Sequence, residues 1–85
     1  MIYVAVKLTS DGAEKLDKET GKPQYVELGE HSDVVAALKN ALVTLGCIKQ
    51  VGLVILKGEN RGGYIVMSKL DYDTYYGVGF FTSMY

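Results

Sequence analysis

The sequence predicts an α+β fold, with a mainly antiparallel sheet of about five strands and one amphipathic helix (Asp33 to Leu45) packed on one face. Three observations lead to this prediction. A segment near the start alternates apolar and other residues with the period of a strand. A central segment carries its apolar residues with the period of a helix. Strand-like segments joined by glycine-rich turns lie on both sides of that helix.

Length and composition indicate one folded domain, residues 1–85. The chain is too short for a second core, and 48% apolar with 22% charged residues is typical of globular proteins. One cysteine and one histidine exclude an intramolecular disulfide and a Cys/His metal cluster. A domain this small has a thin margin of stability, so oligomerisation remains as a source of support.

The first strand runs from Ile2 to Thr9, and a turn at 10–12 follows it. Residues 13–22 allow two interpretations. One is a short helix over Ala13–Lys18. The other is a hairpin whose strands, Glu14–Asp17 and Gln24–Leu28, flank a tip at Lys18–Lys22. We favour the hairpin because Thr20 and Gly21 form a turn signal. The next strand extends from Pro23 to Leu28 and is expected to end at Gly29.

The helix is expected to begin after Ser32 as N-cap, with Asp33 in the first turn, and to stop at Gly46. At about 100° per residue, its main apolar residues fall within one sector of about 120°. This predicted buried face consists of Val34, Val35, Leu38, Ala41, Leu42 and Leu45.

Further strands are expected after the helix. Val51 to Lys57 is apolar on both faces, which is typical of a central strand. The loop Gly58–Gly63 connects it to a strand from Tyr64 to Lys69, and the two are expected to form a hairpin. Leu70 to Tyr76 is expected to be a connector, and Gly77 to Ser83 a final strand.

These elements leave one face of the sheet without cover. A single helix of this length covers only one face, yet Val54, Leu56, Val66 and Phe81 require cover on the other. Three solutions stay open: closure into a barrel, packing against a second copy, or binding of a partner. We favour self-association.

No catalytic or metal constellation is found in the sequence. His31 is the only imidazole, beside the predicted helix start, and Cys47 is expected to be a small buried residue. Asp71 and Asp73 form the only close acidic pair near aromatic residues, without the further oxygen ligands of a calcium loop. We therefore predict no enzyme activity, no cofactor and no bound metal.

Charge and aromatic content narrow the choice of partner. The net charge is −1 and the basic residues are scattered, which disfavours nucleic acid as a partner. Seven tyrosines and no tryptophan are present, and aromatic residues crowd the last fifteen positions. Tyrosine and arginine are enriched at protein interfaces. We accordingly expect a partner-binding surface made of Arg61, Tyr72, Tyr75, Tyr76, Phe81 and Tyr85.

The leading interpretation is a non-enzymatic protein–protein interaction module that self-associates as a homodimer and acts as an adaptor or inhibitor, in the manner of small virus-encoded counter-defence inhibitors. Replacing Tyr75 or Tyr76 with alanine is then expected to weaken association without unfolding the chain. The alternative is a small-molecule or nucleotide-binding protein with a site at a dimer interface, where Arg61 and the Gly58–Gly63 loop hold an anion.

The expected location is the cytoplasm. No apolar run approaches the roughly 20 residues of a membrane helix, and the start of the chain lacks the flanks of a signal peptide. A lone cysteine suits a reducing compartment.

Overall fold

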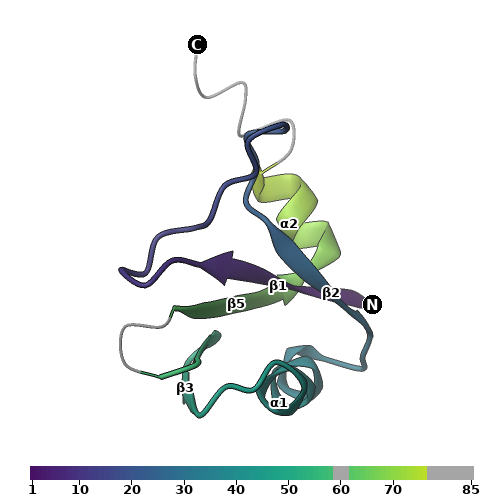
Figure 1. The fold of residues 1–85 in the computed structure, drawn as a ribbon. Coiled ribbons are helices and arrows are strands. Elements are labelled where there is room, and N and C mark those ends of the chain that lie inside the picture. Colours follow the sequence, from purple (N-terminus) through teal and green to yellow (C-terminus); the bar gives the residue numbers. More distant parts are fainter. Residues whose placement is uncertain (59–61, 77–85) are drawn as a thin grey trace.

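The computed structural model describes residues 1–58 and 62–76. Within them the elements follow in the order β1 (Ile2–Leu8), β2 (Tyr25–Glu30), α1 (Val34–Thr44), β3 (Lys49–Val51), β4 (Val54–Leu56), β5 (Gly63–Ser68) and α2 (Lys69–Tyr76). The strands form one antiparallel sheet in the order β2-β1-β5-β4-β3. Figure 1 shows β2, β1 and β5 in this sheet, with β3 farther from β2. The predicted fold class is confirmed, with a second helix added. The described strands do not close into a barrel, because the two outer strands, β2 and β3, do not pair with each other.

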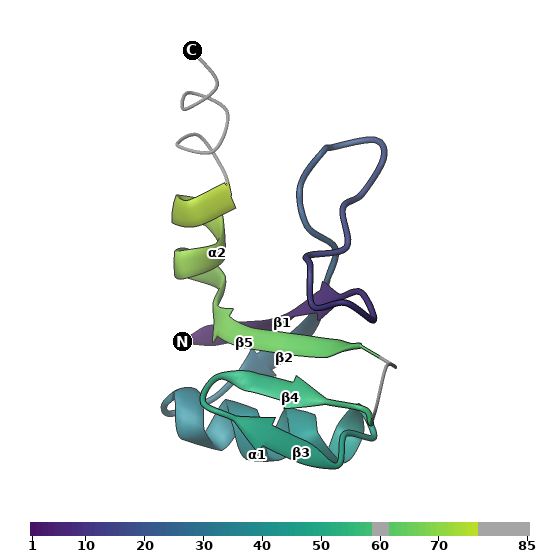
Figure 2. The same ribbon diagram turned by 90° about the vertical axis from the view of Figure 1, so that its left-hand side faces the viewer.

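The two helices pack on opposite faces of the sheet. Tyr3 and Ala5 of β1 lie in the cluster that contains α1, whereas Val4 and Val6 lie in the cluster that contains α2. Successive side chains of a strand point to opposite faces, so these clusters occupy different sides. Figure 2 shows α1 along the lower part of the sheet and α2 rising from the end of β5.

The larger core lies between α1 and the sheet. Its buried members are Tyr3, Ala5, Ala37, Leu38, Ala41, Cys47, Ile55, Tyr64 and Val66. Val66 thus lies under α1, not on the face that was expected to need cover. On the helix itself Val35 is 54% exposed, which corrects its place in the predicted buried face.

The caps of α1 differ from the prediction by one residue at the start. The N-cap is Asp33, not Ser32, because the Asp33 carboxylate accepts a hydrogen bond from the backbone N–H of Ala36 at 2.9 Å. The predicted stop at Gly46 is confirmed, since this residue adopts the left-handed φ of +67° that commonly ends a helix.

Between β1 and β2 the chain makes a hairpin-like excursion, residues 9–24, which we call the arm. The hairpin interpretation of this segment is confirmed: Leu16 bridges to Pro23, and the Asp17 N–H donates to the Lys22 carbonyl at 2.8 Å. The strand after the arm does not stop at Gly29 as expected. Gly29 lies inside β2 opposite Tyr3, where the register with β1 shifts.

The expected central strand from Val51 to Lys57 is wrong, because Gly52 and Leu53 turn the chain back between β3 and β4. Gly52 has a φ of +60°, which a two-residue hairpin turn requires and glycine supplies without strain. Consequently β3 is an edge of the sheet that the described strands form. The hairpin expected around the 58–63 loop is confirmed as β4 and β5.

The expected connector Leu70–Tyr76 is also wrong, because it forms most of α2. The Ser68 hydroxyl accepts a hydrogen bond from the Asp71 N–H at 3.0 Å, and Lys69 pairs with Asp73 one turn later at 2.6 Å. Packing of the apolar side of the helix overrides the moderate helix propensity of tyrosine and aspartate. The final strand predicted at Gly77–Ser83 lies outside the described residues.

No helix among the described residues combines the length and the apolar content required to cross a membrane.

Candidate functional site

Burial falls from β1 toward β3 on the face of the sheet that carries α2, which we call the α2 face. Paired residues of neighbouring strands share a face, and one such row is Tyr25, Val6, Ile65, Val54 and Val51. Val6 is completely buried, Ile65 and Val54 are half-buried, and Val51 is 56% exposed. Thus α2 covers the β1 side of this face and leaves the β4 and β3 side open.

Two tyrosines fix α2 over β1. The Tyr72 hydroxyl donates a buried hydrogen bond to the Pro23 carbonyl of the arm at 2.5 Å, and its ring lies 4.6 Å from that of Tyr25. Tyr76 packs on Val4 and Val6 and hydrogen-bonds to Glu14. Burial raises the pKa of both phenols, and for Tyr76 the Glu14 carboxylate raises the pKa further. Both side chains therefore remain neutral donors at physiological pH.

A groove of about 530 Å³ lies beside α2 on the less covered side of this face; we call it the α2 groove. Tyr75 is 73% exposed there and meets the Tyr76 ring edge-on at a centroid distance of 5.1 Å. The described lining residues are Glu14, Ile65, Met67, Asp71, Thr74, Tyr75 and Tyr76.

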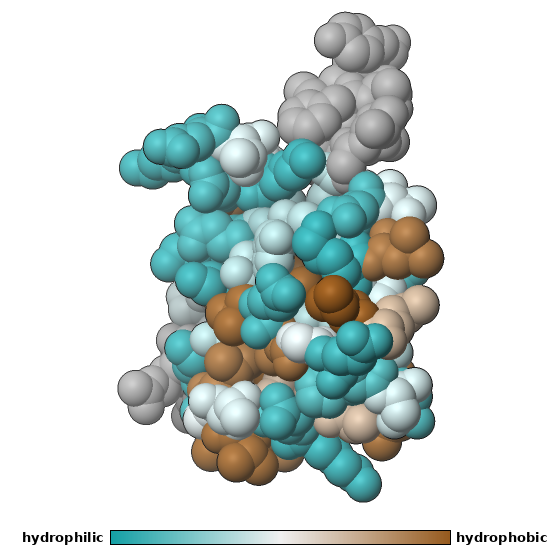
Figure 3. Space-filling model, turned by 90° about the vertical axis from the view of Figure 1, so that its right-hand side faces the viewer, coloured by the Kyte–Doolittle hydropathy of each residue, from teal (hydrophilic) through white to brown (hydrophobic). Residues whose placement is uncertain are grey.

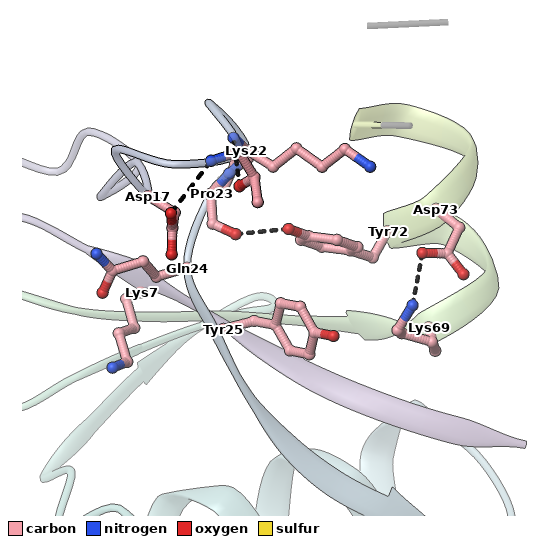
Figure 4. Close-up of a pocket in the computed structure, with 10 residues that line it drawn as sticks. Lys7, Asp17, Lys22, Pro23, Gln24, Tyr25, Lys69, Tyr72 and Asp73 are labelled. Carbon is pink, nitrogen blue, oxygen red and sulfur yellow. Dashed lines mark hydrogen bonds and ion pairs between the residues drawn. The ribbon is translucent and has the colours of Figure 1, made fainter. Parts of the chain in front are cut away.

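A second cleft of about 470 Å³ separates α2 from the arm, and Figure 4 shows three lysines around it: Lys7, Lys22 and Lys69. We call it the lysine cleft. Lys69 is held by Asp73 and lies 5.6 Å from the centre of the Tyr72 ring. The hydrogen bond with Asp73 raises the pKa of the Lys69 ammonium. The Asp17 carboxylate is engaged with backbone N–H groups at the tip of the arm.

The structure separates the residues predicted to bind a partner. Tyr72 and Tyr76 are each only 5% exposed, so their rings serve the packing of α2, whereas Tyr75 faces solvent. Arg61, Phe81 and Tyr85 lie outside the described residues. Sequence reasoning missed Ile65 and Met67 in the α2 groove, although the alternation of the predicted strand from Tyr64 to Lys69 places both on one face.

The residues weighed for chemistry are dispersed. His31 Nε2 lies 3.0 Å from the Leu28 carbonyl, and burial raises the pKa of the Cys47 thiol, which disfavours a reactive thiolate. Asp71 lines the α2 groove and Asp73 the lysine cleft, so the two carboxylates do not converge. Within residues 1–58 and 62–76, no group of three or more His, Cys, Asp or Glu side chains is arranged to hold a metal ion.

The view onto the β2 side shows a different kind of surface (Figure 3). Apolar residues appear there in the middle and lower part, at the level of the sheet and α1, and hydrophilic side chains divide them. On α1, Val35 and Val43 are exposed. Single exposed apolar residues are normal on a soluble surface, so we do not assign a site to α1.

Comparison with family models, with curated proteins and with solved structures finds no match to this chain.

Proposed function

We propose that the protein is a non-enzymatic interaction module that binds another protein surface through the open part of its α2 face. This part is the open strip, made of Val51, Val54, Ile65 and Met67, together with the exposed ring of Tyr75. The observation that supports the proposal is the fall in burial along the paired row from Val6 to Val51. Covering such apolar surface is favourable, and contiguous exposed apolar surface is a feature of interaction sites.

A second copy of the chain is the first partner that we propose. The net charge is only −1, so two copies approach without strong repulsion. A two-fold axis through the open strip would place the same residues of both copies against each other, as in most homodimers. A chain of 85 residues also gains proportionally more from added burial than a larger domain does.

Light scattering during size-exclusion chromatography tests this proposal across a wide range of protein concentration. The expected result is a mass that rises above the 9.3 kDa of one chain toward a dimer as the concentration increases. Val51→Lys places a charge in the open strip and is expected to keep the protein monomeric. Val43→Lys, at an 80% exposed position on α1, is the matched control and is expected to behave like the parent.

A mass of one chain at every concentration would overturn self-association. The proposed interaction with a different protein would then rest on the peptide experiment described below. In either form the action that we propose is steric: the protein covers a partner surface, as an adaptor or an inhibitor does.

A cytoplasmic location belongs to the same proposal, because the buried free thiol of Cys47 suits a reducing compartment.

The lysine cleft supports a second candidate function, the binding of a small anionic ligand such as a nucleotide. Its volume is within the range of small-molecule sites, and the Tyr25 ring offers a surface for stacking beside the lysines. A thermal-shift screen against nucleotides tests it, since a ligand that binds the folded state raises the melting temperature. No shift across the panel would remove this candidate.

A further inference from the structure

Helix α2 separates two clefts of opposite charge character. Three lysines and two aspartates line the lysine cleft. The α2 groove contains the carboxylates of Glu14 and Asp71, and none of its described lining residues is a lysine or an arginine. This contrast, which concerns the same surface as the proposed function and rests on it, points to the chemistry of the partner.

We infer that the α2 groove binds a basic peptide segment of another protein, in which apolar side chains alternate with arginine or lysine. The apolar side chains would contact Ile65 and Met67 of β5, and the cationic groups would meet Glu14 from the arm and Asp71 from the first turn of α2.

Among the described residues, neither of these two carboxylates forms an ion pair. Glu14 is paired with the hydroxyl of Tyr76, a neutral donor, which does not cancel the charge of the carboxylate. The lysine of α2, Lys69, is engaged with Asp73 and lines the other cleft. An anionic or uncharged segment would therefore leave Glu14 and Asp71 without a cation in a partly desolvated groove, which disfavours its binding.

The exposed tyrosine adds to the same preference. The faces of aromatic rings attract cations, most often the guanidinium of arginine. Of the two described rings in the groove, Tyr75 is the more exposed, and it meets Tyr76 edge-on. A guanidinium placed between a carboxylate and the Tyr75 ring would make both contacts at once, which favours arginine over lysine in the bound segment.

A pair of capped pentapeptides tests the inference on the full chain. One alternates leucine with arginine and the other alternates leucine with glutamate, so they differ in charge and share their apolar residues. Binding is followed through the methyl resonances of Ile65 and Met67. With the arginine peptide, the expected result is chemical-shift changes that saturate, and a binding affinity that falls when salt is added. With the glutamate peptide, no saturation is expected.

Charge-neutral variants locate the effect. Glu14→Gln and Asp71→Asn are each expected to lower the affinity for the arginine peptide by a factor of about 1.5 to 5, which is the range expected from the loss of an exposed ion pair. Glu19→Gln, at the tip of the arm and outside both clefts, removes the same charge and is expected to leave the affinity unchanged. Circular dichroism of each variant confirms that the fold is retained.

The outcomes separate this inference from the proposed function. If both peptides bind equally and Tyr75→Ala weakens both, the charge preference is overturned and the groove keeps its proposed role. If neither peptide binds at concentrations at which the chain is monomeric, while the chain dimerises through the open strip at higher concentrations, the basic partner is likewise overturned. If neither peptide binds and the chain stays monomeric, both proposals fail.

Discussion

At the scale of single residues, the three tyrosines of α2 have distinct roles. Tyr72 and Tyr76 are four positions apart, so they share the side of the helix that contacts β1, and both are buried. Tyr75 precedes Tyr76 by one residue, which turns it by about 100° toward solvent. Because of this position, only Tyr75 of the three presents most of its ring to a partner.

This difference gives a prediction on stability. Tyr76→Ala is expected to lower the free energy of unfolding by about 3 kcal/mol, because it leaves a cavity over Val4 and Val6 and breaks the hydrogen bond with Glu14. Tyr75→Ala is expected to change it by less than about 0.5 kcal/mol, as at other exposed positions. Urea denaturation measures both. Equal losses in the two variants would contradict the assignment of Tyr76 to the core and Tyr75 to the surface.

At the scale of elements, helix ends depend on a single side-chain contact. Two neighbouring residues, Ser32 and Asp33, are both good N-cap types, and sequence preference does not separate them. The structure does so, because the Asp33 carboxylate accepts the Ala36 N–H. Likewise, Gly52 turns the apolar stretch after α1 into two short strands by adopting a positive φ.

The cap of α1 provides the second prediction. Asp33→Ala is expected to cost about 1 kcal/mol of stability, because the Ala36 N–H loses its partner and a negative charge leaves the positive end of the helix dipole. Ser32→Ala is the matched control, with an expected change within about 0.5 kcal/mol. Thermal melting followed by circular dichroism distinguishes them. A larger loss for Ser32→Ala would restore the N-cap expected from the sequence.

At the scale of the whole molecule, the sheet has a protected centre and an exposed edge. β1 and β5 each pair with a strand on both sides, and their faces meet both helices. All three residues of β3 are exposed, and among the described strands β3 pairs only with β4. Cover from α1 on one face and from α2 over only part of the other makes the molecule asymmetric, and this asymmetry is the basis of the proposed function.

Hydrogen exchange of backbone amides tests this arrangement. The slowest exchange is expected in β1 and β5, close to the rate set by global unfolding, and much faster exchange is expected in β3. The measurement is made on dilute protein. If the β3 amides were protected as strongly as those of β1 at low concentration, the edge assigned to β3 would be contradicted. Protection of β3 that appears only at high concentration would indicate that a second copy pairs with this edge.

The sequence by itself determined the elements whose pattern is local: the alternating first strand, the amphipathic α1 and the hairpin of the arm. It also indicated that α1 could not cover the whole sheet, which led to the expected uncovered face. The predictions of these three elements succeeded because strand and helix periods, and turn residues, act over a few neighbouring positions. The uncovered face was only partly right, because α2 covers the β1 side of it.

Only the tertiary structure decided which tyrosines are buried and how far the second face is covered. Taken alone, Leu70–Tyr76 has no strong helical signal; the segment folds as α2 because Tyr72 and Tyr76 reach β1 and the arm. The α2 groove likewise combines Glu14, Ile65 and Tyr75, which are far apart in the sequence. Contacts between distant segments depend on the packing of the whole chain, and local pattern does not specify them.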